Sequence, residues 1–190
     1  MIELGKGLFV DRDGVVNREQ GYVWQLTDFV LEPAFLELAQ HASKLGYRIV
    51  VVTNQGGVGK GLYTEADVEL LHQHLYATLA DLGVPAPLVF SCPHHPSTSA
   101  CLCRKPNTLL FERALHLYRL DPRKCWMLGD RARDVIPAKQ LGMQTVLITS
   151  HSAEEGPTPE ADLLVPTILE ASTYLIKKLS ASDSTHSSAC

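Results

Sequence analysis

The chain has 190 residues, of which 45% are hydrophobic and 20% charged, and its formal net charge is −4. This length suits a single domain with a substantial core, and the composition is ordinary for a soluble globular protein. The charge balance gives no indication of a nucleic-acid partner, and no apolar run is long enough to cross a membrane. Residues 1–6 lack a signal-peptide pattern, so we expect a cytoplasmic monomer with neither nucleic-acid nor membrane partners.

Strand-like and helix-like segments alternate along the chain. Short apolar runs, often β-branched, predict strands at residues 8–10, 48–52, 85–91, 125–128 and 145–148. Apolar residues at helical spacing predict helices at residues 33–45, 108–118, 131–141 and 168–179, and a further helix that begins at Thr64. Repeated β–α units favour an α/β fold, a Rossmann-like three-layer sandwich with a mainly parallel central sheet and no cap domain. We assign residues 1–180 to one domain and expect the serine-rich residues 181–190 to form a disordered tail.

The first predicted strand ends at a pair of acidic residues. Asp11 follows the apolar run directly, Asp13 comes two residues later, and Gly14 lets the chain turn. In an open α/β sheet, ligands lie beyond the carboxyl ends of the strands, so Asp11 is placed where an enzyme would hold a nucleophile. The alternative is an Asx-type turn that only ends the strand.

Other predicted strands also end at polar residues. One leads to Thr53 and Asn54, a later one leads to Asp130, and the loop before another helix supplies Lys105. Because the carboxyl ends of parallel strands share one edge of a sheet, these groups should meet the acidic pair there. Carboxylates, a hydroxyl, an amide and an ammonium together are suited to phosphoryl transfer.

Each group has a chemical role in such a reaction. Asp11 can attack phosphorus to form an aspartyl-phosphate, and Asp13 can protonate the leaving alkoxide and later activate water. Thr53 can donate hydrogen bonds to the transferring group, while Lys105 offsets its negative charge. Mg²⁺ prefers hard oxygen ligands, which Asp11 and Asp130 supply.

Together these segments resemble, in the same order, the four motifs of the haloacid dehalogenase superfamily of phosphatases. The matching residues are 11–17, 53–55, 103–106, and 129–130 with Asp134. The resemblance implies that Asp11 is the nucleophile and Asp13 the general acid and base. It also implies that Mg²⁺ is bound by Asp11, the backbone carbonyl of Asp13, and Asp130. Asp134 is either a carboxylate that supports these ligands or a residue on the helix surface.

The loop that contains Lys105 also carries a cluster of soft ligands. Cys92, His94, Cys101 and Cys103 offer three thiols and an imidazole within twelve residues. Such a set suits a structural Zn²⁺ site with no open position, and ordinary loop thiols are the alternative. A disulfide is disfavoured because five cysteines without a secretion signal indicate a reducing compartment. A zinc clamp would order the long loop and deliver the cationic residues that follow it.

This loop resembles that of a narrower branch, the D-glycero-D-manno-heptose 1,7-bisphosphate 7-phosphatases and the related histidinol-phosphate phosphatases, in which the zinc is structural. Matches with the heptose enzymes extend to residues 21–23, 50–55 and 92–96. By that similarity, we expect the substrate to be bound by Glu19, Gln20, Gly21, Tyr22, Asn54, Gln55, Arg104 and Arg131. His95 then faces either the substrate or solvent, and Tyr22 and Trp24 form either a flap over the site or ordinary packing.

The sequence departs from the pattern of the branch in places that affect substrate identity. Arg131 stands where the family often has lysine, and the turn at residues 56–61 replaces a Ser-Gly-x-Ala-Arg-Gly pattern. That turn lacks the spacing of a nucleotide-binding loop, so we interpret it as a strand-to-helix turn that lines the phosphate pocket. His72 and His74 lie two apart on a predicted helix and are expected at the surface.

The sequence thus predicts a Mg²⁺-dependent phosphatase that acts on a small phosphorylated substrate. Heptose 1,7-bisphosphate is the first candidate, and histidinol phosphate is the alternative. A non-catalytic phosphate-binding protein on the same fold is the alternative from another class. The intact pair of Asp11 and Asp13 argues against this alternative, because a site that had lost catalytic activity would be expected to lose one of the two aspartates.

Overall fold

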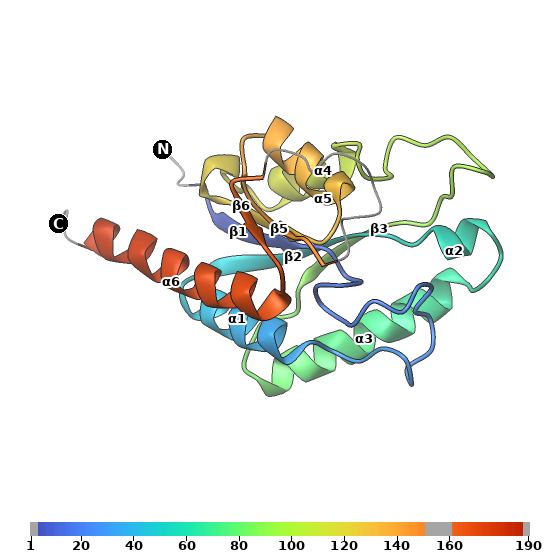
Figure 1. The fold of residues 1–190 in the computed structure, drawn as a ribbon, viewed down its shortest axis with the longest axis horizontal. Coiled ribbons are helices and arrows are strands. Elements are labelled where there is room, and N and C mark those ends of the chain that lie inside the picture. Colours follow the sequence, from blue (N-terminus) through green and yellow to red (C-terminus); the bar gives the residue numbers. More distant parts are fainter. Residues whose placement is uncertain (1–3, 151–160, 188–190) are drawn as a thin grey trace.

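The computed structural model describes residues 4–150 and 161–187, which form one parallel sheet covered by helices (Figure 1). The strands are β1 (Lys6–Val10), β2 (Tyr47–Asn54), β3 (Leu88–Cys92), β4 (Trp126–Gly129), β5 (Gln144–Ile148) and β6 (Leu163–Val165). The helices are α1 (Pro33–Lys44), α2 (Gly56–Gly59), α3 (Glu65–Asp81), α4 (Leu109–Leu117), α5 (Ala132–Gln140) and α6 (Ile168–Ser187), with a 3-10 turn η1 (Pro122–Lys124).

The order of the strands places a ligand-binding crevice at the centre of the sheet. The order is β3-β2-β1-β4-β5-β6, and neighbouring strands pair in parallel. The chain builds outward in one direction from β1 to β3 and in the other from β4 to β6. The direction therefore reverses between β1 and β4, where open α/β sheets bind their ligands beyond the carboxyl ends.

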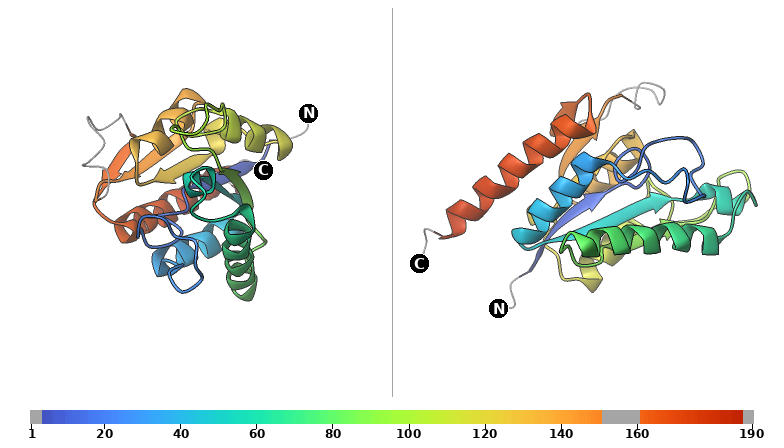
Figure 2. Two further views of the ribbon diagram at one scale, coloured as in Figure 1. Left: turned by 90° about the vertical axis from the view of Figure 1, so that its right-hand side faces the viewer. Right: turned by 90° about the horizontal axis from the view of Figure 1, so that it is seen from below.

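Helices cover both faces of the sheet, as the sequence predicts. In β1, Leu8 and Val10 join the core shared with α1, α3 and α6, whereas Phe9 joins the core shared with α4 and α5. Figure 2 shows these two helical layers on opposite sides of the strands. The expected Rossmann-like three-layer α/β fold is confirmed. It places the ends of β1 and β4 between two packed layers, which hold them rigidly.

The structure differs from the predicted elements mainly at their ends. β3 begins at Leu88 rather than at 85, because two prolines precede it and cannot donate to a ladder. The short elements β6 and α2 were not predicted. α6 continues to Ser187, whereas the sequence predicts a helix that ends at residue 179; no proline or glycine interrupts residues 181–187, and residues 188–190 lie outside the described part. Among the described residues, no helix has the length and apolarity needed to cross a membrane.

Candidate active site

The acidic residues predicted at the strand ends converge at the crevice. Asp11 follows β1 and Asp130 follows β4, and one carboxylate oxygen from each of Asp11, Asp130 and Asp134 lies within 4.8 Å of the others. All three residues are buried, and Asp134 has no exposed surface. The alternative that placed Asp134 on the helix surface is therefore wrong. The first turn of α5 points it inward, where it accepts a hydrogen bond from the backbone N–H of Arg131 at 3.0 Å.

Lys105 connects two of these carboxylates. Its Nζ lies 2.8 Å from Asp11 Oδ1 and 2.6 Å from Asp134 Oδ1, and it also donates to the Val52 carbonyl at 2.6 Å. Burial by itself would lower the pKa of Lys105, but the two carboxylates raise it overall, so the ammonium stays charged. Asn54 fixes this loop through two hydrogen bonds to the backbone of Lys105, at 3.0 and 3.1 Å.

The positive charges of Lys105 and of Arg131, whose Nε lies 3.6 Å from Asp130 Oδ2, do not balance three buried carboxylates. Burial raises the pKa of Asp11 to about 7, with Asp134 raising it further and Lys105 lowering it. Burial likewise raises the pKa of Asp130 to about 9, again with a contribution from Asp134. Hard oxygen donors gathered at this distance, with an excess of negative charge, fit a divalent cation such as Mg²⁺. The donor set therefore suits the predicted metal.

The turn after β1 can pass over Asp130 only because residue 14 is glycine. Gly14 has a φ of 84°, and a Cβ at this position would overlap the Asp130 carboxylate. The turn is closed by two hydrogen bonds, from the Gly14 N–H to the Asn17 carbonyl and from the Val16 N–H to the Arg12 carbonyl, both 2.8 Å long. This geometry sets Asp13 beside Asp11.

Asp13 is held through both of its carboxylate oxygens. Oδ1 accepts hydrogen bonds from Arg12 Nη2 at 3.0 Å and from Asn17 Nδ2 at 3.1 Å. Oδ2 accepts from Gln55 Nε2 at 3.0 Å, and the same amide nitrogen donates to Thr53 Oγ1 at 2.8 Å. The predicted catalytic residues Asp13 and Thr53 thus share one hydrogen-bond network. Arg12, which is fully buried, was missed because arginine usually lies at the surface.

Most of the predicted substrate-binding residues line a single cavity of about 210 Å³ next to Asp13. They are Glu19, Gly21, Tyr22, Asn54, Gln55 and Arg104. Gln20 and Arg131 are not among its lining residues. Arg131 is instead the N-cap residue immediately before α5, and its Nε lies 3.6 Å from Asp130 Oδ2.

Three further residues, His95, Tyr63 and Arg133, line the same cavity. For His95, this favours the alternative in which it faces the substrate. Tyr63 and Arg133 were not predicted, since each lies outside the four motifs. Arg133 lies in the first turn of α5, only three residues after Asp130, and this proximity in sequence could have indicated that it lies at the same end of the sheet.

The four soft ligands also come together. Cys92 Sγ lies 3.6 Å from Cys101 Sγ and 3.2 Å from Cys103 Sγ, while His94 Nδ1 lies 3.3 Å from Cys103 Sγ and 3.7 Å from Cys92 Sγ. All four donors lie within 4.8 Å of one another, and the three cysteines are free thiols. Zn–S bonds of about 2.3 Å in a tetrahedral site separate the ligand atoms by about 3.8 Å. The cluster therefore fits the predicted zinc.

Several known proteins that are similar to this chain are named as phosphatases. Residues 102–171 match the model of the HAD-hydrolase-like family. D-glycero-beta-D-manno-heptose-1,7-bisphosphate 7-phosphatase from Helicobacter pylori is 33% identical over 158 residues, 83% of this chain and 90% of the relative. The enzyme of the same name from Haemophilus ducreyi is 32% identical over 179 residues, 90% of this chain and 98% of the relative. The chain belongs to the heptose-1,7-bisphosphate 7-phosphatase family of the haloacid dehalogenase superfamily.

A solved structure agrees with this membership of the heptose-1,7-bisphosphate 7-phosphatase family. The D,D-heptose 1,7-bisphosphate phosphatase from B. bronchiseptica, complexed with magnesium and phosphate, superposes with a TM-score of 0.80 at 26% identity. The match covers 90% of this chain and 99% of the other. The recognition of the family from the four motifs and the cysteine loop is thereby confirmed.

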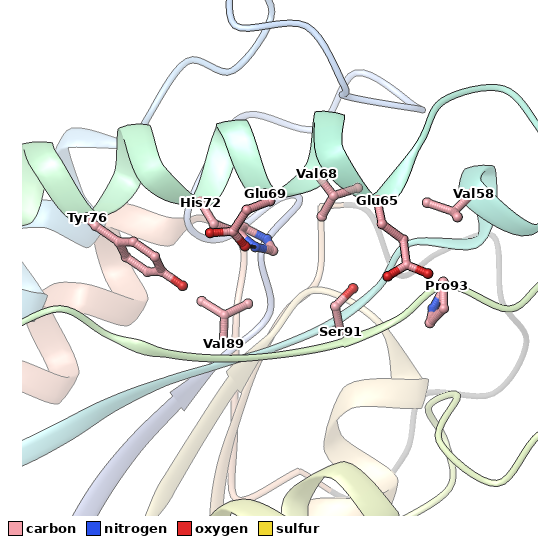
Figure 3. A pocket seen from close by; sticks show the side chains of 9 residues that line it. All are labelled: Val58, Glu65, Val68, Glu69, His72, Tyr76, Val89, Ser91 and Pro93. Carbon is pink, nitrogen blue, oxygen red and sulfur yellow. Dashed lines mark ion pairs between the residues drawn. The ribbon is translucent and has the colours of Figure 1, made fainter.

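This heptose bisphosphate phosphatase family member has a second cavity, of about 180 Å³, between α3 and the edge strand β3 (Figure 3). Its described lining contains none of the residues predicted for catalysis or substrate binding. One lining residue, His72, is only 4% exposed, so its expected place at the surface is wrong. It shares the buried face of α3 with Val68 and Leu75, at helical spacing. Burial lowers the pKa of His72 to about 4, and the nearby Arg12 lowers it further.

Proposed function

We propose that the protein is a Mg²⁺-dependent phosphatase that removes the C7 phosphate of D-glycero-D-manno-heptose 1,7-bisphosphate. The observation that carries the proposal is the placement of Asp11 beside Lys105 and Asp130, with Asp13 at the mouth of the adjoining cavity. Relatives named for this activity are similar along most of the chain. The cavity next to Asp13, of about 210 Å³, offers room for a small phosphorylated substrate.

The reaction would proceed in two transfers at phosphorus. An Asp11 carboxylate oxygen attacks the phosphorus, and the bond between phosphorus and the sugar oxygen breaks while Asp13 protonates that oxygen. Asp13 then removes a proton from a water molecule, which attacks the aspartyl-phosphate and releases inorganic phosphate. Lys105 offsets negative charge throughout, and its charge helps Asp11 to stay ionised.

Mg²⁺ would be held by Asp11, Asp130 and the backbone carbonyl of Asp13. It would neutralise charge on the transferring phosphoryl group. Zn²⁺ would be held by the cluster of Cys92, His94, Cys101 and Cys103 and would have a structural role. The loop after this cluster leads directly to Arg104 and Lys105, so ordering the loop also orders the site.

The two guanidinium groups in the cavity, which also contains the Asp13 and Glu19 carboxylates, favour a bisphosphate over histidinol phosphate. Arg104 and Arg133 line the cavity, and Arg104 Nη1 is fixed by the His94 carbonyl at 3.0 Å. A second phosphate group is attracted to these guanidinium groups, because each guanidinium can donate two parallel N–H hydrogen bonds to phosphate oxygens. Histidinol phosphate would instead bring its own ammonium towards them. We also propose a cytoplasmic monomer, consistent with the free thiols of the described cysteines.

A comparison of substrates tests the proposal. With Mg²⁺ present, kcat/KM for heptose 1,7-bisphosphate is expected to exceed that for histidinol phosphate by at least about tenfold. The Asp11→Asn variant should lose activity on both substrates while it keeps the fold. A preference for histidinol phosphate would contradict the assigned substrate. Full activity of Asp11→Asn would contradict the assigned chemistry.

A further inference from the structure

Tyr63 joins the hydrogen-bond network of Asp13 from outside the four motifs. Its hydroxyl donates to Gln55 Oε1 at 2.9 Å, and the nitrogen of the same amide donates to Asp13 Oδ2 at 3.0 Å. Tyr63 is 7% exposed and Gln55 is 2% exposed, so the hydrogen bond between them is largely buried, whereas Asp13 at the end of the chain lines the cavity. Burial raises the pKa of Tyr63, which keeps its proton available for donation.

The surroundings of Tyr63 fix its ring. It stacks on Trp24, with ring centroids 6.5 Å apart and planes 12° apart, and meets the edge of Tyr22 at 6.2 Å. On its other side, the ring lies so close to Gly57 that a Cβ there would overlap it. The glycine-rich turn at residues 56–61 therefore also provides the space that the ring of Tyr63 occupies.

The donors around Asp13 show which of its oxygens exchanges the proton. Oδ1 accepts hydrogen bonds from Arg12 and Asn17, which occupy its lone pairs. Within the described part of the chain, Oδ2 accepts one hydrogen bond, from Gln55, and Asp13 lines the cavity. An amide N–H cannot accept a proton, so a proton on Oδ2 passes to a substrate oxygen or to water.

We propose that Tyr63 is a positioning residue that holds the Gln55 amide and thereby aims Asp13 Oδ2 at the leaving oxygen of the substrate. This inference rests on the proposed phosphatase function and adds to it a residue outside the motifs. Tyr63 acts through Gln55 and does not touch the reacting atoms. Its loss would therefore weaken general acid catalysis, whereas attack by Asp11 would be unchanged.

Two esters that differ in their leaving group separate this role from a structural one. p-Nitrophenolate leaves without much help from an acid, whereas a sugar alkoxide needs a proton. In Tyr63→Phe, kcat/KM is expected to fall by about tenfold for heptose 1,7-bisphosphate and by less than about twofold for p-nitrophenyl phosphate. The parameter kcat/KM covers the steps up to the first phosphoryl transfer, and so excludes the later hydrolysis. Tyr76→Phe, in α3 and without a described hydrogen bond to Gln55, is the control and should change neither value.

A double-variant comparison tests whether Tyr63 acts through Gln55. In a Gln55→Leu background, adding Tyr63→Phe should leave the ratio of the two kcat/KM values unchanged. An equal fall for both esters in Tyr63→Phe, or no fall for either, would overturn the proposal. Independent effects of the two substitutions would also overturn it. Failure of the unchanged protein to hydrolyse any phosphate ester would overturn the proposed function instead.

Discussion

Gly14 is the residue on which the geometry of the acidic cluster depends most directly. Gly14 has a positive φ and lies close to Asp130. Any side chain at this position would therefore cause both backbone strain and a steric overlap with the Asp130 carboxylate. Gly83 offers a matched comparison, since its φ is 73° and a Cβ there would meet nothing within 4 Å. A side chain would be strained by the positive φ at both Gly14 and Gly83, but it would overlap a neighbouring residue only at Gly14.

Gly83→Ala is expected to destabilise the fold by about 1–2 kcal/mol because alanine is strained at positive φ, and Gly14→Ala is expected to cost more because its Cβ also overlaps the Asp130 carboxylate. Only Gly14→Ala should also displace the Asp130 carboxylate. It should therefore raise the Mg²⁺ concentration needed for half-maximal activity by about tenfold or more. Thermal unfolding and a Mg²⁺ titration of activity measure the two effects. Equal Mg²⁺ dependence in both variants would contradict the role of Gly14.

His72 makes stability depend on pH. Its pKa is lowered from 6.5 to about 4 in the folded protein, so between these values the unfolded chain binds a proton that the folded chain does not. Stability from this group is present above pH 6.5 and is lost as the pH falls towards 4, with an upper limit of roughly 3 kcal/mol. In His72→Gln, this part of the pH dependence should disappear. The exposed His116 is the control, since His116→Gln should keep the dependence of the unchanged protein.

At the scale of elements, the loop between β3 and α4 couples the thiol cluster to the active site. It begins at Cys92, which ends β3, and continues to Lys105, whose ammonium contacts Asp11. Asn54 ties the backbone of this loop to the end of β2. Disorder in the loop would therefore withdraw a cation from the buried acidic cluster.

The cluster is expected to bind one equivalent of zinc in the purified protein. Cys101→Ser should reduce the zinc content, lower the melting temperature, and reduce activity even with excess Mg²⁺, because Lys105 is no longer held in place. Cys125 lies outside the cluster, with its thiol directed to the Asp121 carbonyl. Cys125→Ala should therefore keep its zinc. Metal analysis that finds no zinc in the unchanged protein would contradict the assignment.

The sequence was most informative where an element has a strong local signal. The β-branched run of β2 and the start of a helix at Thr64 were both predicted, and Thr64 forms a capping box with Asp67 through hydrogen bonds of 2.8 and 3.2 Å. β6 has three residues, too few for a periodic pattern to be distinguished from a loop. The composition of α6 after residue 180 is typical of a tail, and composition alone gives no information on whether a preceding helix continues.

The candidate site shows the same limit at the level of residues. Asp11, Asp13, Asp130 and Lys105 follow strands or belong to motifs, so their meeting at one edge could be predicted. Side chains that reach the site from elsewhere could not, because their contacts depend on tertiary packing. Tyr63 is an example, since it lies outside the four motifs and reaches the site through its hydrogen bond to Gln55.

At the scale of the whole molecule, α6 closes one face of the sheet. Ala171, Leu175 and Leu179 are fully buried in the core shared with α1, and Ser180 Oγ lies 2.8 Å from His41 Nε2. The described contacts between α6 and the rest of the chain thus extend to residue 180, the predicted end of the domain.

Two truncations test this domain boundary. A chain that ends at Ser180 is expected to melt within about 2 °C of the full chain, because it keeps the buried face of α6. A chain that ends at Thr167 loses three buried apolar residues worth about 5 kcal/mol, a large part of the stability of a typical domain, and should be unfolded or aggregated. A large fall in melting temperature on removal of residues 181–190 alone would show that the domain extends further.

The residues that line the cavity beside Asp13 come from two kinds of segment. Asn54 and Gln55 stand at the end of the central scaffold, whereas Tyr22, His95 and Arg104 come from connecting segments that can vary in length without disturbing the sheet. The side chains that contact the substrate can therefore differ between relatives while Asp11 and Asp13 stay in place. Replacing Tyr22 and His95 with the residues of a relative that prefers another substrate should change substrate preference, while the thiol cluster and Lys105 keep the reaction steps.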